Sequence, residues 1–295
     1  MTTLAHVGSG VFEPLQVIGI TAFGALYAIR AANLARQGRA VPTWRIVSYF
    51  TGLTLILAMF VSPVAHIGSE LVLAHMIQHL LIGDVAALML VLGLTRSMLQ
   101  PVMALKAFEK LQVLMLPQVA LVLWIANLFI WHVPVLYEGA VTNEAVHALQ
   151  HSCFIGVGFL MWMPLAGPLP KPAWFTGGVQ VGYIGISRLA SAGLGNIFMW
   201  SGTVLYPVYA PGQAYWGISP LSDQGTAGVI MMIEGGIVTL GVLAYTLLRW
   251  AQHESEEQRL LELAEERGVE LSPERAGRAV AAGHGARLED RLRGQ

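Results

Sequence analysis

The chain has 295 residues, of which 55% are hydrophobic and 12% charged, and its mean hydropathy is +0.60. This composition excludes an ordinary soluble globular domain and indicates a protein embedded in membrane lipid. The formal net charge of −1 provides no basic excess for a nucleic-acid partner, so we expect none. The single cysteine, Cys153, excludes a disulfide within the chain and any site built on a Cys-x-x-Cys pair.

Seven apolar runs are long enough to cross a hydrocarbon core of about 30 Å. They lie at about residues 14–33, 44–62, 71–94, 114–133, 146–166, 179–205 and 225–249. The first run is full length and residues 1–13 contain no Lys or Arg, so we expect this helix to be retained rather than cleaved as a signal peptide. The sequence therefore predicts an all-α integral membrane protein, with a seven-helix transmembrane bundle over residues 1–250.

Basic residues occur in alternate connections between these runs. Short loops rich in Lys and Arg are retained on the cytoplasmic side of a membrane. We therefore expect the N-terminus outside and the C-terminus inside, in a multi-pass protein of a bacterial cytoplasmic membrane. The basic residues that predict this orientation are Arg30, Arg36, Arg39, Arg45, Arg96, Lys106, Lys110, Lys171 and Arg249.

Residues 251–295 form a charged segment that differs sharply from the bundle. Its first part, residues 252–267, places Leu260, Leu261 and Leu263 among Glu and Arg, which is typical of a short amphipathic helix. The remainder is expected to be disordered. We interpret the whole segment as a cytoplasmic tail, either solvated or docking a partner.

Two pairs of histidines, His75 with His79 and His147 with His151, lie four residues apart inside the third and fifth runs. Side chains at this spacing share one helix face, about 6 Å apart along the axis. Both pairs, and His132 in the fourth run, fall near the predicted outer end. A single membrane histidine would more often be structural, but polar groups in lipid usually face the bundle interior and mark a site. The pattern predicts that these five imidazoles meet in one outward-open pocket and bind a metal ion or cofactor.

Other side chains in the outer half are candidates to complete this site. The glutamines could fix which ring nitrogen faces a metal, or simply link neighbouring helices. Sulfur together with imidazole favours copper, Cu(I) in particular, over magnesium or calcium, although methionine is also ordinary core filler. Asp223 could cap the last helix, bind the metal, or both, and capping is the preferred interpretation. The candidates are Met76, Gln78, Gln150, Cys153, Asp223, Gln224, Met231 and Met232.

Two charged residues, Asp84 and Arg188, are expected deep in the membrane. Counting residues from opposite surfaces places them at nearly the same depth, so we predict a buried ion pair that holds the bundle, with a role in a proton path or in substrate binding as the alternative. Glu234 in the last run is the competing partner for Arg188. Ser187, Ser191 and Gly195 are small residues spaced four apart, which favours close packing of the sixth helix.

Four motifs in chain order resemble the CtaG-type cytochrome c oxidase assembly factors. They are HMIQHLL from His75, WHVPVLYEGAV from Trp131, HALQH from His147 and SDQGTAGVIMM from Ser222. The resemblance covers about residues 14–249 and leaves out the tail. It implies a membrane assembly factor for a haem-copper oxidase, thought to help deliver copper, with the five histidines and the pair Asp223 and Gln224 as matching positions. The chain departs from the pattern at Gln150, where Glu is common, and at Met232, where Trp is common.

We therefore interpret the chain as a copper-binding assembly factor that is not an enzyme. Its expected partners are membrane lipid and a subunit of a haem-copper oxidase, served from an extracytoplasmic metal site. One alternative is a seven-helix zinc hydrolase, with three histidines on zinc and Glu70, Asp223 or Glu144 as general base. The other is a haem protein with His79 opposite His151.

Overall fold

The computed structural model describes residues 14–281 and 283–294, and these residues form helices and connecting loops without a β-strand. Residues 1–13, which include the predicted outer N-terminal segment, lie outside this description. The helices of the first half are α1 (Pro14–Arg36), α2 (Thr43–Val61), α3 (Pro63–Gly68), α4 (Val72–Leu80), η1 (Leu81–Ala86), α5 (Ala87–Gly93), α6 (Arg96–Met103), α7 (Lys106–Leu111), η2 (Gln112–Met115) and α8 (Pro117–Trp131). Those of the second half are α9 (Pro134–Thr142), α10 (Glu144–Ala166), α11 (Gly177–Trp200), η3 (Pro207–Tyr209), α12 (Ala210–Trp216), α13 (Pro220–Glu266), α14 (Pro273–Ala281) and α15 (Gly285–Arg293).

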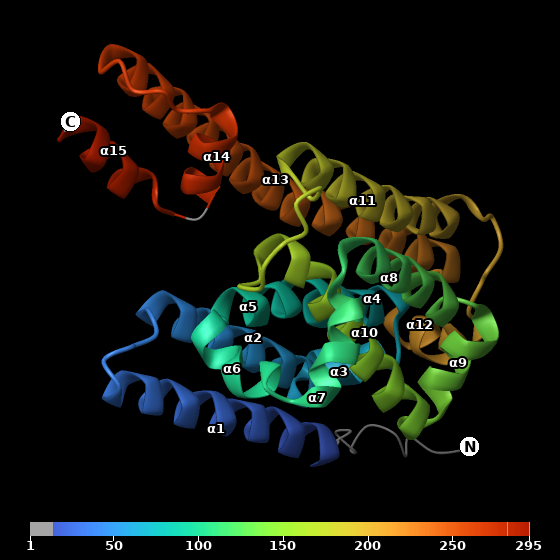
Figure 1. Cartoon of the computed structure of the whole chain (residues 1–295). Coiled ribbons are helices and arrows are strands. Elements are labelled where there is room, and N and C mark those ends of the chain that lie inside the picture. Colours follow the sequence, from blue (N-terminus) through green and yellow to red (C-terminus); the bar gives the residue numbers. More distant parts are fainter. Residues whose placement is uncertain (1–13, 282, 295) are drawn as a thin grey trace.

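The centre of the bundle is the continuous segment α4–η1–α5, which packs against α2, α10 and α13 (Figure 1). Its middle part, η1, is a π-helical turn, and such turns are rare and often found at functional sites. A Cβ at Gly158 of α10 would lie only 1.9 Å from the Gly83 carbonyl oxygen of η1. Glycine is therefore required where α10 crosses η1.

Helix α11 lies beside α13 along one side of the bundle (Figure 1). A Cβ at Gly195 would lie 2.8 Å from the Gly228 carbonyl oxygen, so the two backbones are in close contact. Ser187 and Ser191 are also buried on this side of α11. The predicted packing stripe of the sixth helix is thus present.

Each of the seven predicted runs is helical, but fewer than seven are clear membrane spans. Among the described residues, five helices are long and apolar enough to cross a membrane. A sixth is counted if Lys106–Met115 and Pro117–Trp131, bent by 70° at their junction, form one broken span. The remaining helix, α11, has 24 residues but includes Arg188, Gln180 and Asn196. Seven spans and their orientation therefore stay predictions.

Arginines of the first connection gather at the C-terminal end of α5. Arg45 Nη1 donates to the carbonyls of Leu92 (2.9 Å) and Leu94 (2.5 Å) at this end. Guanidinium groups are favourable there because the last carbonyls of a helix lack partners within the helix. Arg30 Nη2 donates at 2.7 Å to the carbonyl of Ser97 in α6, which lacks its usual helical donor because Pro101 has no N–H. Positive charge predicted for one membrane side is thus concentrated at one end of the bundle.

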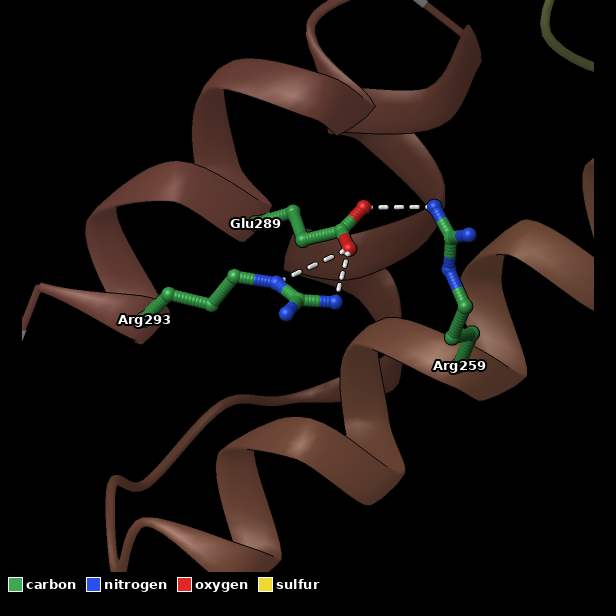
Figure 2. Close-up of polar contacts among 3 residues, drawn as sticks. All are labelled: Arg259, Glu289 and Arg293. Carbon is green, nitrogen blue, oxygen red and sulfur yellow. Dashed lines mark hydrogen bonds and ion pairs between the residues drawn. The ribbon is translucent and has the colours of Figure 1, made fainter.

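The C-terminal segment differs from its prediction in two ways. The expected separate amphipathic helix is part of α13, which runs unbroken for 47 residues, and helices α14 and α15 replace the expected disorder. The physical reason is a small apolar core, separate from that of the bundle, whose buried members are Leu260, Ala264, Ala276, Val280 and Leu292. Figure 2 shows Glu289 of α15 paired with Arg259 of α13 (2.5 Å) and Arg293 (2.8 Å). Both arginines are exposed, so these ion pairs add little to the stability given by the core.

Candidate metal centre

The five predicted histidines converge from three helices. His75 and His79 project from α4, His147 and His151 from α10, and His132 follows the last residue of α8. Within the pairs, the ring centroids lie 4.3 Å and 4.0 Å apart. Between helices the separations are 5.5 Å for His75–His147, 5.3 Å for His79–His151 and 6.4 Å for His79–His132. The predicted meeting of these imidazoles is therefore present in the fold.

The helix starts bring these rings to a common level. Asn143 caps α10, where its Oδ1 accepts from Ala145 N at 3.0 Å and Val146 N at 3.2 Å. The N-cap residue of α4, Leu71, makes no side-chain capping hydrogen bond, and Asp223 of α13 caps this helix instead. Its carboxylate oxygens accept from Val72 N at 2.9 Å and Leu73 N at 3.0 Å, and Gln213 Nε2 donates to it at 2.8 Å. Asp223 therefore positions the helix that carries His75 and His79 rather than facing a metal.

Several ring nitrogens of this cluster are buried without a hydrogen bond. His75, His79 and His151 are each at most 4% exposed. Within the described part of the chain, Nε2 of His75 and both ring nitrogens of His79 and His151 have no hydrogen-bond partner. Buried polar atoms are nearly always paired, because an unpaired one costs about 1–3 kcal/mol. A bound metal ion would give these nitrogens partners, so the donor set fits the predicted ligand.

The rings are nevertheless not arranged as a preformed metal-binding site. No group of three or more His, Cys, Asp or Glu side chains in residues 14–281 and 283–294 is placed to hold one ion as it stands. With metal–nitrogen bonds of about 2.0 Å, two rings on one ion have centroids at most about 6.3 Å apart, and only when the two bonds are in line. The separations of 5.5 Å and 5.3 Å between α4 and α10 lie within that limit, whereas the 6.4 Å from His79 to His132 is just beyond it, so these two rings must approach each other slightly to share an ion.

The sequence predicts an outward-open cluster, but in the structure aromatic side chains cover it. His79 stacks on Phe154 at 4.4 Å and His151 on Phe60 at 5.1 Å, and of the five histidines only His147 is partly exposed. Above them, Tyr137 lies 4.9 Å from His75 and 5.9 Å from His132, measured between ring centroids. The cover arises because the connections after α8 and α11 fold back over the helix ends.

Three tyrosines form this cover, which we call the tyrosine cap: Tyr137, Tyr206 and Tyr209. Tyr137 and Tyr206 stack at 3.9 Å, Tyr209 Oη donates to Tyr137 Oη at 3.2 Å, and Tyr206 Oη donates to the His132 carbonyl at 2.8 Å. Burial raises the pKa of all three phenols, so they stay protonated and able to donate. The cap was not predicted, because tyrosines near the ends of apolar runs are also typical of a membrane-interface belt.

Most of the other candidate residues make hydrogen bonds that support the fold or contact residues outside the histidine cluster. Gln224 is fully engaged: its Oε1 accepts from Leu205 N at 2.8 Å, and its Nε2 donates to Ser201 Oγ at 2.8 Å. Gln78 Nε2 donates to the Met59 carbonyl at 3.0 Å instead of serving a ring nitrogen. Gln150 is fully buried, with no hydrogen bond of ordinary geometry among the described residues. Cys153 is a free, half-buried thiol, and Met232 Sδ lies 3.8 Å from Asn196 Nδ2.

A cavity of about 30 Å³ lies at the inner end of the cluster. It is lined by His79, His132, Met76 and Met231, and on its other side by Asp84 and Ser191. Met76 and Met231 are 1% and 2% exposed. A volume of about 10–15 Å³ suffices for one water, so an ion or a water fits.

The predicted ion pair between Asp84 and Arg188 borders this cavity. Arg188 Nη1 and Nη2 donate to the two carboxylate oxygens of Asp84 at 2.5 Å and 3.0 Å, a bidentate arrangement. The guanidinium also lies over the rings of Trp162 (5.6 Å) and Trp124 (5.9 Å). Neither carboxylate oxygen of Glu234, the predicted competitor, accepts a hydrogen bond from a described residue.

The family model described as cytochrome c oxidase caa3 assembly factor (Caa3_CtaG) matches residues 25–253, which include every helix of the cluster. The chain belongs to this family. The match contains the cavity, the ion pair and the tyrosine cap, and ends within α13. The C-terminal unit of α14 and α15 lies outside the matched part of this caa3 assembly factor family member.

Curated relatives add little about the activity of this family member. It is 24% identical over 246 residues to the uncharacterized proteins Mb0105 of Mycobacterium bovis and MT0111 of Mycobacterium tuberculosis. Each match covers 77% of this chain but 37% of the relative, so the chain spans well under half of their length. No solved structure matches the chain.

Proposed function

We propose that this protein is a membrane assembly factor that binds copper at the histidine cluster and delivers it to a subunit of a haem-copper cytochrome c oxidase. The observation that carries the proposal is the meeting of five imidazoles from α4, α8 and α10, where buried ring nitrogens of His75, His79 and His151 lack partners among the described residues. The family membership supports the oxidase as the recipient. The protein binds and releases its cargo without catalysing a reaction, and the cluster faces the extracytoplasmic side.

The residues that would hold copper are His75, His79, His132, His147 and His151. Imidazole binds copper through neutral nitrogen and can be exchanged for ligands of a recipient protein. Helices α4 and α10 supply two ligands each on one face, and Asp223 and Asn143 fix the starts of those helices. The phenyl rings of Phe60 and Phe154 exclude water from the sides.

The structure gives less support to the two alternatives. A zinc hydrolase needs a free acid near the metal, but Asp223 is occupied by three donors and Glu70 Oε2 accepts from Trp216 Nε1 at 2.6 Å. The third candidate, Glu144, is exposed in the first turn of α10. A porphyrin does not fit between His79 and His151, because their ring centroids are 5.3 Å apart and the adjoining cavity is about 30 Å³.

The test is the metal content of the purified full-length protein and of two variants, His79→Ala and His151→Ala. We expect copper in the wild type and loss of bound copper in both variants, because each removes an imidazole from the centre of the cluster. His253→Ala, which removes an imidazole from the C-terminal half of α13, should keep wild-type copper content. Copper retained in both cluster variants would refute the proposal, as would zinc or haem in place of copper.

A further inference from the structure

The inner end of the histidine cluster contains sulfur as well as nitrogen. Met76 of α4 and Met231 of α13 line the cavity that also contacts His79 and His132. Both thioethers are almost completely buried, so they meet other protein atoms and not lipid or water.

The hydrogen bonding of His132 determines which nitrogen faces the sulfur. His132 Nδ1 lies 2.6 Å from the Leu128 carbonyl oxygen, which can only accept, so Nδ1 carries the ring proton. A buried imidazole without a counter-ion is neutral, because burying an unpaired charge is costly. Nε2 of His132 is therefore unprotonated and presents a lone pair.

That lone pair points at another acceptor. His132 Nε2 lies 3.4 Å from Met76 Sδ, and a thioether has no hydrogen to donate. The contact therefore joins two lone pairs without a hydrogen bond between them. If one ion bound both atoms, with bonds of about 2.0 Å to nitrogen and about 2.3 Å to sulfur, the N–ion–S angle would be about 105°. That angle is close to the tetrahedral value, so the two atoms are already spaced as ligands of one ion.

We propose that the cavity between His132, Met76 and His79 is a binding site for Cu(I), with Nε2 of His132 and Sδ of Met76 as its first two ligands. Thioether sulfur is a soft ligand that favours Cu(I) over Zn(II) and over the harder divalent ions. His79 supplies a third ligand, because it lines the same cavity and both its ring nitrogens lack partners among the described residues; its ring must move slightly toward His132, since the two centroids are 6.4 Å apart. This inference rests on the proposed function, and it specifies the oxidation state of the bound copper and the position of the ion within the cluster.

The charges around the cavity suit a monovalent cation. Asp84 lines the same cavity and its partner Arg188 does not, so the negative end of this ion pair is the nearer one and lowers the cost of a cation there. Both Asp84 oxygens are bound to Arg188, so the carboxylate acts through space and not as a ligand. The nearby ion pair and the neutral ligands leave little negative charge to balance a divalent ion, which favours the singly charged Cu(I).

The experiment compares Cu(I) and Zn(II) binding to the full-length protein in detergent, using competing chelators, together with X-ray absorption of the Cu(I) form. Wild type should show sulfur in the copper coordination shell. Met76→Leu, which keeps the side-chain volume, should lose this sulfur signal and weaken Cu(I) binding by at least about tenfold. Zn(II) binding should change much less, because zinc can use the imidazoles alone.

The matched control is Met232→Leu, since this neighbouring thioether contacts Asn196 and does not line the cavity. It should leave both the sulfur signal and Cu(I) affinity unchanged, whereas Met231→Leu should weaken Cu(I) binding less than Met76→Leu does. Copper bound with nitrogen ligands alone, or a sulfur signal that persists in Met76→Leu, would overturn this inference and leave the proposed function standing. A wild-type protein that takes up no copper would overturn both.

Discussion

Asp223 shows how a single carboxylate can organise a site without entering it. Capping was the preferred interpretation from sequence, but α13 already has its own cap, Ser219, whose Oγ accepts from Ser222 N at 3.2 Å. Asp223 instead serves α4, about 150 residues away in the chain. Sequence spacing within one helix identifies a cap for that helix, whereas a cap supplied by a distant helix depends on packing and could not be read from the chain.

Replacing Asp223 with Ala should destabilise the bundle and disturb the cluster. The change leaves Val72 N, Leu73 N and Gln213 Nε2 buried without an acceptor, and we expect the free energy of unfolding to fall by about 2–4 kcal/mol. Copper affinity should fall too, because the first turn of α4 positions His75. Unfolding in detergent and copper titration measure the two effects.

Ser219→Ala is the control for this variant, since it removes a cap from exposed residues at the start of α13. It should cost about 1 kcal/mol and leave copper affinity unchanged. Equal losses of stability and of copper affinity in the two variants would show that Asp223 has no special role in positioning α4.

Histidine placement was readable from the sequence, and the environment of the histidines was not. The four-residue spacing of His75 with His79 and His147 with His151 fixes a shared helix face, which led to the correct prediction that the rings meet. Their closure by the tyrosine cap depends on loops, whose path follows no period. The polar partners of Gln78 and Gln224 likewise depend on where those loops return to the bundle.

The π-helical turn η1 is the part of the central segment that α10 crosses at close range. The sequence predicted a single regular helix over residues 71–94, and no Pro within it marks an interruption. The wider turn coincides with the crossing of Gly83 and Gly158, so tertiary packing and not local preference accounts for it. Membrane-length helices were predictable because lipid burial depends on composition alone.

Gly158→Ala should separate α10 from η1. Its Cβ would clash with the Gly83 carbonyl, and we expect a loss of about 1–3 kcal/mol in unfolding free energy together with weaker copper binding, because α10 carries His147 and His151. Gly156→Ala on the same helix meets no atom within 4 Å, so it should be neutral or stabilising by up to about 1 kcal/mol. If Gly156→Ala lowers stability or copper affinity more than Gly158→Ala does, then the close approach of Gly158 to η1 is not what requires glycine in α10.

The whole chain comprises two apolar cores, one in the bundle and one in the C-terminal unit. The second was missed because the segment is highly charged. Its signal was present as apolar pairs four residues apart, Leu260 with Ala264, Ala276 with Val280, and Leu288 with Leu292. These pairs define one face on each of three helices, and the faces pack together at the end of α13 (Figure 1).

Leu260→Ala should loosen the C-terminal unit and leave the bundle intact. Removing a fully buried leucine costs about 2–5 kcal/mol, which is large for so small a core. Hydrogen exchange in α14 and α15 should speed up, while copper binding stays as in wild type because the cores are separate. Glu265→Ala, an exposed position on the same helix, should leave exchange unchanged. Protection that persists in Leu260→Ala would show that ion pairs and not the core hold the unit.

The closure of the cluster beneath Tyr137, Tyr206 and Tyr209 determines how fast a cargo ion would come and go. The phenols, stacked and hydrogen-bonded to each other and to the backbone at His132, close the cluster beneath the loops after α8 and α11, so an ion that enters from this side needs those loops to separate. Dwell time would then be governed by the frequency of that separation and not by bond strength alone. An ion held this way would be shielded from small-molecule chelators. Its transfer would require a recipient protein that separates these loops on binding.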